Sequence, residues 1–168
     1  MESVRYFDIE TDGLHKAETR GTVPVILTNL DGQTPCLRDV DEKQLVVGAI
    51  EWLHTSSVPV IGKNLIWDLD FLRARVKALG GHFDLYWWLR SRKYVDVKII
   101  GILLNEGRFA GYQKWIDRDG KPSGAEVPEW HKNNEWDRII QYSQNERLDV
   151  LGIWEKAGKI LREQWNHL

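Results

Sequence analysis

The chain has 168 residues, of which 42% are hydrophobic and 29% charged, so it is long enough for one domain with a sizeable core. Its formal net charge of −2 excludes a strong overall attraction to nucleic acid or to an anionic membrane. The single cysteine, Cys36, excludes an internal disulfide and fits a reducing compartment. With no signal peptide and no apolar run near about 18 residues, we expect a cytoplasmic protein without a membrane partner.

Hydrophobic periodicity and turn signals predict alternating strands and helices. Strands are expected over residues 4–7, 23–30, 34–38 and 58–62, the middle two joined by a turn at Asp31-Gly32. Helices are expected over residues 41–54, 65–79, 95–104 and 135–165, with an irregular or partly helical stretch over 105–135. This order indicates a mixed sheet covered by helices, that is, one α/β domain spanning residues 1–168.

The stretch Asp8-Ile9-Glu10-Thr11-Asp12-Gly13-Leu14 follows the first expected strand and carries two carboxylates two residues apart. Side chains at this spacing in a strand share a face, so Asp8 and Glu10 would lie side by side. Their charges repel and raise each other's pKa unless a cation lies between them, and Mg²⁺ or Mn²⁺ suits such hard oxygen ligands. The alternative is an exposed strand end with two acids of no special role.

Residues 61–72 read IGKNLIWDLDFL and form a second acidic element, where an expected strand leads into a helix. Asp68 falls in the first helical turn, where the helix dipole favours a carboxylate whatever its function. Asn64 can brace the preceding loop through side-chain hydrogen bonds. Asp70 lies off the face of Asp68, so we expect it to be solvated or to support the site from behind.

DIETDGL, followed by GKNLIWDLDFL, resembles the first two motifs of the DEDD superfamily of 3′–5′ exonucleases. The family pattern is Asp-x-Glu on a first strand, then Asn-x-x-x-Asp at a helix start, and the matching residues are Asp8, Glu10, Asn64 and Asp68. The resemblance implies an RNase H-like fold, a mixed β-sheet flanked by helices. It also implies that Leu14 packs against the terminal base, that Asn64 contacts substrate, and that Asp96 is a structural acid.

The family requires a further carboxylate on a late helix, and the branch that this chain resembles most is the DEDDy group related to family-B polymerase proofreading domains. In that branch a Tyr stands four residues before an Asp, whereas here Tyr142 precedes Asp149 by seven residues and Glu146 by four. On a helix all three share one face, so either acid can complete the site. We favour Asp149, because Asp149-Val150 continues as the family does, and keep Glu146 as the alternative.

The resemblance implies phosphodiester hydrolysis with two divalent ions, Mg²⁺ or Mn²⁺. The metal ligands that it implies are Asp8, Glu10, Asp68 and Asp149. Tyr142 would orient the attacking water, and Lys121 would stabilise phosphate charge. The expected substrate is a single-stranded or frayed 3′ end, of DNA more than of RNA. A polymerase or another replication or repair protein is the expected partner in trans, and a phage or mobile-element origin fits the compact chain.

Two rival functions stay open. The irregular third motif fits a catalytically impaired protein that keeps the fold as a nucleic-acid- or protein-binding module. The other rival is an endonuclease of the same fold that cuts structured DNA. Basic residues available for substrate contact are Arg73, Arg75 and Lys77 on the second helix and Arg90, Arg92 and Lys93 beside two tryptophans. Solvated helix charge and core packing explain these two sets equally well.

Overall fold

The computed structural model describes residues 4–11, 26–27, 41–108 and 123–165. Its strands are β1 (Arg5–Tyr6), β2 (Ile9–Glu10), β3 (Ile26–Leu27), β4 (Val60–Gly62) and β5 (Tyr94–Asp96). Its helices are α1 (Glu42–Thr55), α2 (Leu65–Ala78), α3 (Leu85–Ser91), α4 (Val97–Leu104), the 3₁₀ turn η2 (Gly124–Glu126), α5 (Val127–Lys132) and α6 (Trp136–Trp165).

Three strands form a parallel sheet in the order β1-β4-β5, and β2 and β3 form an antiparallel pair. Arg5 aligns with Val60, which in turn aligns with Tyr94. Parallel neighbours need crossover connections, and α1 lies between β1 and β4 in the chain, as α2 and α3 lie between β4 and β5. The domain is therefore α/β, with a small, mostly parallel sheet and a large helical share.

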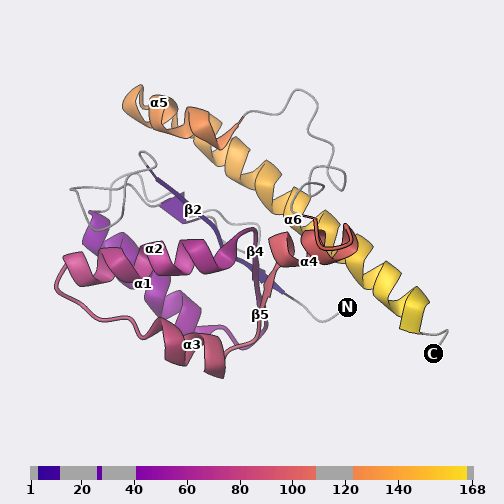
Figure 1. The fold of residues 1–168 in the computed structure, drawn as a ribbon. Helices are drawn as coiled ribbons and strands as arrows, with labels where there is room; N and C mark the ends of the chain where they lie inside the picture. The colour runs from indigo at the N-terminus through magenta and orange to yellow at the C-terminus, as the bar shows by residue number, and fades with distance from the viewer. Residues whose placement is uncertain (1–3, 12–25, 28–40, 109–122, 166–168) are drawn as a thin grey trace.

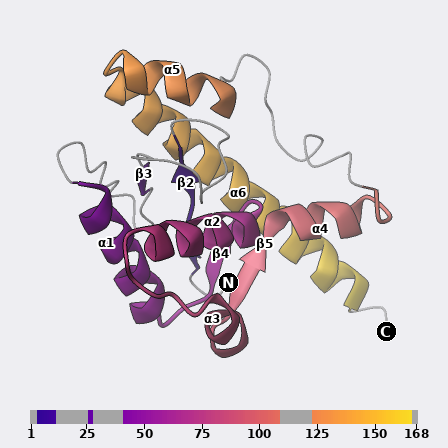
Figure 2. The same cartoon turned by 60° about the vertical axis from the view of Figure 1, so that its left-hand side comes forward.

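The parallel sheet lies between two helical layers, with α1 and α2 on one side and α6 on the other (Figure 1 and Figure 2). Neighbouring residues of a strand point to opposite faces. Phe7 and Val60 accordingly join the core cluster beneath α1 and α2. Tyr6 and Ile61 join Val150 of α6 in a second cluster on the other face. The two strands are buried on both faces, as parallel strands usually are.

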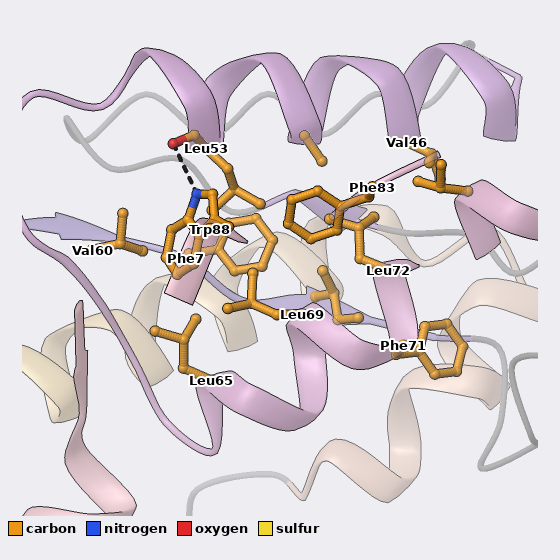
Figure 3. Packing of buried hydrophobic residues seen from close by; sticks show 13 residues of the cluster. Phe7, Val46, Leu53, Val60, Leu65, Leu69, Phe71, Leu72, Phe83 and Trp88 are labelled. Atoms are coloured by element: carbon orange, nitrogen blue, oxygen red, sulfur yellow. Dashed lines mark hydrogen bonds between the residues drawn. The ribbon is translucent and has the colours of Figure 1, made fainter. Parts of the chain in front are cut away.

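The larger core cluster fills the space between the sheet and the helices α1, α2 and α3 (Figure 3). Trp88 of α3 is fully buried there, and its indole Nε1 donates a hydrogen bond of 3.2 Å to the carbonyl oxygen of Leu53. Leu65, Leu69 and Leu72 bury one stripe of α2 in the same cluster. Each such side chain contributes roughly 1.5–3 kcal/mol relative to exposure. This packing fixes α2 against the sheet.

Helix α6 is the longest helix, and α4 and α5 pack against it (Figure 1). Val127 and Trp130 of α5 meet Ile139 and Tyr142 of α6 in a third buried cluster. The first half of α6 is thus held by α5, and its middle is held by the sheet through the second cluster. In the described ranges, no helix combines the length and the apolar character that crossing a membrane would need.

Most of the expected elements are confirmed. The helices expected over 41–54, 65–79 and 135–165 end within one residue of their predicted bounds, and β1 and β4 lie inside the strands expected over 4–7 and 58–62. The helix expected from residue 95 instead begins at Val97, because the residues before it hydrogen-bond to β4 as β5. Of the expected hairpin, residues 26–27 pair with β2, and the turn at Asp31-Gly32 lies outside the described residues.

Candidate active site

Charged side chains gather where the three parallel strands end. Asp8 follows β1, Lys63 and Asn64 follow β4, and Asp96 is the last residue of β5. In open α/β sheets, ligands bind outside the carboxyl ends of the strands. This edge of the sheet is therefore the candidate active site.

The loop between β4 and α2 is held in one conformation. A Cβ added at Gly62 would stand 2.6 Å from the carbonyl oxygen of Phe7, so only glycine fits where β4 passes the end of β1. Asn64 has a left-handed backbone conformation (φ 58°), and its backbone N–H donates a hydrogen bond of 2.9 Å to Oδ1 of Asp96. The ammonium of Lys98 donates a hydrogen bond of 2.8 Å to Oδ1 of Asn64. Asn64 therefore braces the loop, and Asp96 acts as a structural acid.

The two acids of α2 have opposite environments. Asp68 is 4% exposed, and its Oδ2 is buried without a hydrogen-bond partner among the described residues. Burial, followed by the charges of Asp8 and Glu10, raises the pKa of Asp68 well above its usual value. Asp70 is exposed and forms an ion pair of 2.7 Å with Arg73. Asp68 therefore belongs to the acidic cluster, whereas Asp70 belongs to the surface.

The pKa values of Asp8 and Glu10 are shifted by the same neighbouring charges, Glu146 and Lys63. Asp8 is buried, and its Oδ2 also lacks a hydrogen-bond partner in the described part of the chain. Burial raises the pKa of Asp8 to about 7, with a further rise from Glu146 and an opposing effect from Lys63. Burial, followed by the charges of Asp8 and Glu146, raises the pKa of Glu10. A carboxylate from α6 thus raises the pKa values of two N-terminal acids.

Glu146 brings the last helix into the cluster. It is 5% exposed, and both of its carboxylate oxygens accept hydrogen bonds of 3.2 Å from Nζ of Lys63. Its position depends on α6 being seated on the sheet through the second core cluster. The site is therefore assembled from β1 and β2, from the β4–α2 region and from α6.

Tyr142 lies one helical turn before Glu146. Its ring packs edge-on against Trp130 with the centroids 6.0 Å apart, and a Cβ added at Gly124 would stand 2.8 Å from its hydroxyl. Burial raises the pKa of Tyr142 most, followed by the charge of Glu146, and a hydrogen bond to Glu146 adds to the rise. The phenol therefore keeps its proton and faces the acidic cluster.

Asp149 lies about one turn beyond Glu146 and is 8% exposed. Glu146 is among the charges that raise the pKa values of Asp8 and Glu10. The next residue, Val150, packs against the sheet in the second cluster. An electrostatic link to the N-terminal acids is therefore seen for Glu146, and Asp149, buried one turn further along α6, stays the other candidate for the fourth ligand.

The donor set suits a hard divalent cation. Carboxylate oxygens are the ligands that Mg²⁺ and Mn²⁺ prefer, and the buried oxygens on Asp8 and Asp68 that lack partners destabilise the fold unless a cation or a proton meets them. In the described ranges, no group of three or more His, Cys, Asp or Glu side chains already stands in an arrangement that could hold an ion. A metal site built from these acids would need them to lie closer together than they do in the described part of the chain.

Two predicted substrate contacts, Leu14 and Lys121, lie outside the described residues. Lys63 receives no role from the sequence alone, although its place immediately before Asn64 in the second acidic motif puts it at the same strand end as the acids. Arg75 was expected on the polar face of its helix, but it is buried and bonds to Glu42 at 2.6 Å. It is therefore unavailable as a surface contact for nucleic acid.

No protein-family model matches this chain, and no curated protein matches it. The function of the site therefore rests on the geometry and charge of its own residues.

Proposed function

We propose that this chain is a metal-dependent nuclease with an RNase H-like fold, which removes nucleotides from the 3′ ends of single-stranded or frayed nucleic acid, DNA in preference to RNA. The proposal rests on two observations: Oδ2 of Asp8 and Oδ2 of Asp68 are buried without a hydrogen-bond partner among the described residues, and Asp8, Glu10, Asp68 and Glu146 are linked electrostatically through their effects on one another's pKa values. Buried carboxylates that repel one another destabilise a fold, and a bound divalent cation offsets that cost.

These four acids would hold the metal ions, Mg²⁺ or Mn²⁺. When bound, two such ions supply a nucleophilic water at neutral pH and stabilise charge on the attacking and leaving oxygens of a phosphodiester. Asp8 and Glu10 each interact electrostatically with the other acids of the cluster. Replacement of either one should therefore abolish activity.

Glu146 takes the place of Asp149 as the fourth ligand in this proposal. Tyr142 then stands four residues before the acid, which is the spacing of the family that the motifs resemble. The raised pKa of Tyr142, caused by burial and then by Glu146, keeps its hydroxyl protonated, so that it can orient an attacking water by a hydrogen bond. A polymerase or repair protein acting in trans would supply the frayed ends.

Digestion of a 5′-labelled single-stranded DNA oligonucleotide with Mn²⁺ tests the proposal. The wild type is expected to give a ladder of products that shorten from the 3′ end, and an RNA oligonucleotide of the same sequence is expected to be cut more slowly. Asp68→Asn should abolish the ladder, whereas Asp70→Asn, two residues away on the same helix but exposed, should leave it intact.

Two other results would point to the rival functions. A single internal cut by the wild type would indicate an endonuclease. Binding of the oligonucleotide without any cleavage, in Mn²⁺ and in Mg²⁺, would indicate a binding module that has lost catalysis. Equal activity of Asp68→Asn and Asp70→Asn would remove Asp68 from the site.

A further inference from the structure

Lys63 is paired with the acidic cluster through Glu146. Its Nζ lies 3.2 Å from each of the two carboxylate oxygens, and the side chains of Lys63 and Glu146 are 31% and 7% exposed. Equal distances to both oxygens place the ammonium across the open edge of the carboxylate. A metal ion that used both oxygens would have to occupy the same edge.

The charge of Lys63 reaches the rest of the cluster. It lowers the pKa values of Asp8, Glu10 and Asp68, against the larger effect of burial. Lys63 projects from the loop that Gly62 and Asn64 hold in place, so the backbone fixes where its ammonium can reach. One monovalent ammonium nevertheless balances only part of the charge of four carboxylates.

We propose that Lys63 is a built-in counter-ion, which a divalent metal must displace from Glu146 when it enters the acidic cluster. The inference rests on the proposed function, because it takes Glu146 as a metal ligand. An ammonium and a metal ion at the same carboxylate repel each other, and the ammonium also occupies the oxygens that the metal needs. Lys63 therefore stabilises the cluster before metal arrives and weakens metal binding.

Calorimetric titration with Mn²⁺ tests this role in the whole chain. Lys63→Gln is expected to bind Mn²⁺ about tenfold more tightly than the wild type, a change of about 1.4 kcal/mol. Without metal, the same variant should melt at a lower temperature. Lys63→Arg keeps the charge and should resemble the wild type, as should Lys77→Gln, which removes one exposed positive charge from α2.

The outcomes separate this inference from the proposed function. Equal or weaker Mn²⁺ binding by Lys63→Gln, with binding by the wild type intact, would overturn the counter-ion role and leave the metal site standing. If neither protein binds Mn²⁺, the metal site fails and the counter-ion role fails with it. Binding by Lys63→Gln alone would support the displacement most strongly.

Amine acylation of the wild type gives a second reading that does not depend on the folding of a variant. Displacement predicts that mass spectrometry detects faster labelling of Lys63 in Mn²⁺ than in a chelator, with Lys77 labelled equally in both. Labelling of Lys63 that stays unchanged or slows in Mn²⁺ would overturn the inference.

Discussion

Asp8, which follows β1, interacts electrostatically with Glu146 of α6. Burial, together with the negative charge of Glu146, raises the pKa of Asp8 to about 7. The two residues belong to opposite ends of the chain and meet because α6 packs on the sheet that contains β1. A carboxylate pair of this kind is a property of the tertiary structure, and it can be tested residue by residue.

The choice between the two acids of α6 gives the first prediction. We expect Glu146→Gln to lower kcat by at least about 100-fold, a usual loss when one preorganised charged group is removed from an active site. Asp149→Asn should stay within about tenfold of the wild type, because the proposal gives the ligand role to Glu146, whose charge raises the pKa values of Asp8 and Glu10. Single-turnover digestion of a labelled oligonucleotide measures both; the reverse order of damage would make Asp149 the ligand.

The pH dependence of stability gives the second prediction. In the absence of metal, the folded protein binds a proton at Asp8 up to a pH of about 7, whereas an unfolded aspartate loses it near its usual pKa of 3.8. The folded state therefore holds more protons between these values, and its free energy of unfolding falls as the pH rises through this window. We expect Tm in a chelator to be several degrees lower at pH 8 than at pH 5.

Asp8→Asn is the control for this effect. It removes the buried charge, so its Tm should change less with pH and should exceed that of the wild type at pH 8, although the variant should be inactive. Thermal melts at pH 5, 6, 7 and 8 would show this. A wild-type Tm that rises from pH 5 to pH 8 in the chelator would contradict the raised pKa of Asp8.

Tyr142 gives the third prediction. Tyr142→Phe removes only the hydroxyl, which hydrogen-bonds to Glu146, so we expect kcat to fall about 10- to 100-fold with little change in KM. Stability should change by only about 1 kcal/mol, the usual net value of a hydrogen bond. Tyr86→Phe on the exposed surface of α3 is the matched control and should change neither quantity. A wild-type kcat in Tyr142→Phe would leave the phenol with a packing role alone.

Gly62 gives the fourth prediction. Gly62→Ala forces a Cβ to within 2.6 Å of a backbone oxygen, so β1 and β4 must move apart, and we expect a loss of about 1–3 kcal/mol. Gly48→Ala in α1 meets nothing within 4 Å and should instead stabilise the protein by about 0.5–1 kcal/mol, since alanine is the better helix former. Urea unfolding of the two variants gives both values, and equal midpoints would contradict the close approach.

Arg75 gives the fifth prediction. Its side chain and that of Glu42 are 5% and 9% exposed, and removal of one partner leaves the other as an uncompensated buried charge. We expect Arg75→Met to cost about 3–5 kcal/mol. Arg73→Met breaks an exposed ion pair with Asp70 and should cost less than about 1 kcal/mol. Chemical denaturation measures the free energy of unfolding of both variants. A loss of less than about 1 kcal/mol in Arg75→Met would show that the Glu42 carboxylate becomes hydrated once its partner is removed.

Local signals account for the elements that the sequence predicts well. Asp41 caps α1 by accepting a hydrogen bond of 3.0 Å from the backbone amide of Gln44, and Gly80, with a positive φ of 80°, follows the end of α2. The strand β5 escapes prediction because it runs directly into the apolar residues of α4, so that its end reads as the start of a helix, and because it is defined by its pairing with β4, which lies far away in the sequence. Short parallel strands depend on partners that local periodicity does not reveal.

In the candidate site, too, some residues can be predicted from local sequence and others depend on distant contacts. Asp8 and Asp68 stand in motifs that can be recognised in the linear sequence, and each has a buried oxygen that meets no hydrogen-bond partner among the residues that the structure describes. The choice between Glu146 and Asp149 cannot be made from helical periodicity, because both acids share a face of α6. It depends on where α6 crosses the sheet, and this is set by the second core cluster, to which Val150 of α6 and Tyr6 of β1 both belong.

The dependence of the acidic cluster on α6 also sets an order of events during synthesis. Asp8, Glu10 and Asp68 leave the ribosome long before Glu146, and the sheet with α1 and α2 can form a core while the last helix is still being made. The four-acid cluster cannot exist on the growing chain until Glu146 has emerged and α6 has docked. Under the proposed function, a nascent chain that still lacks a docked α6 would not yet have the complete set of metal ligands.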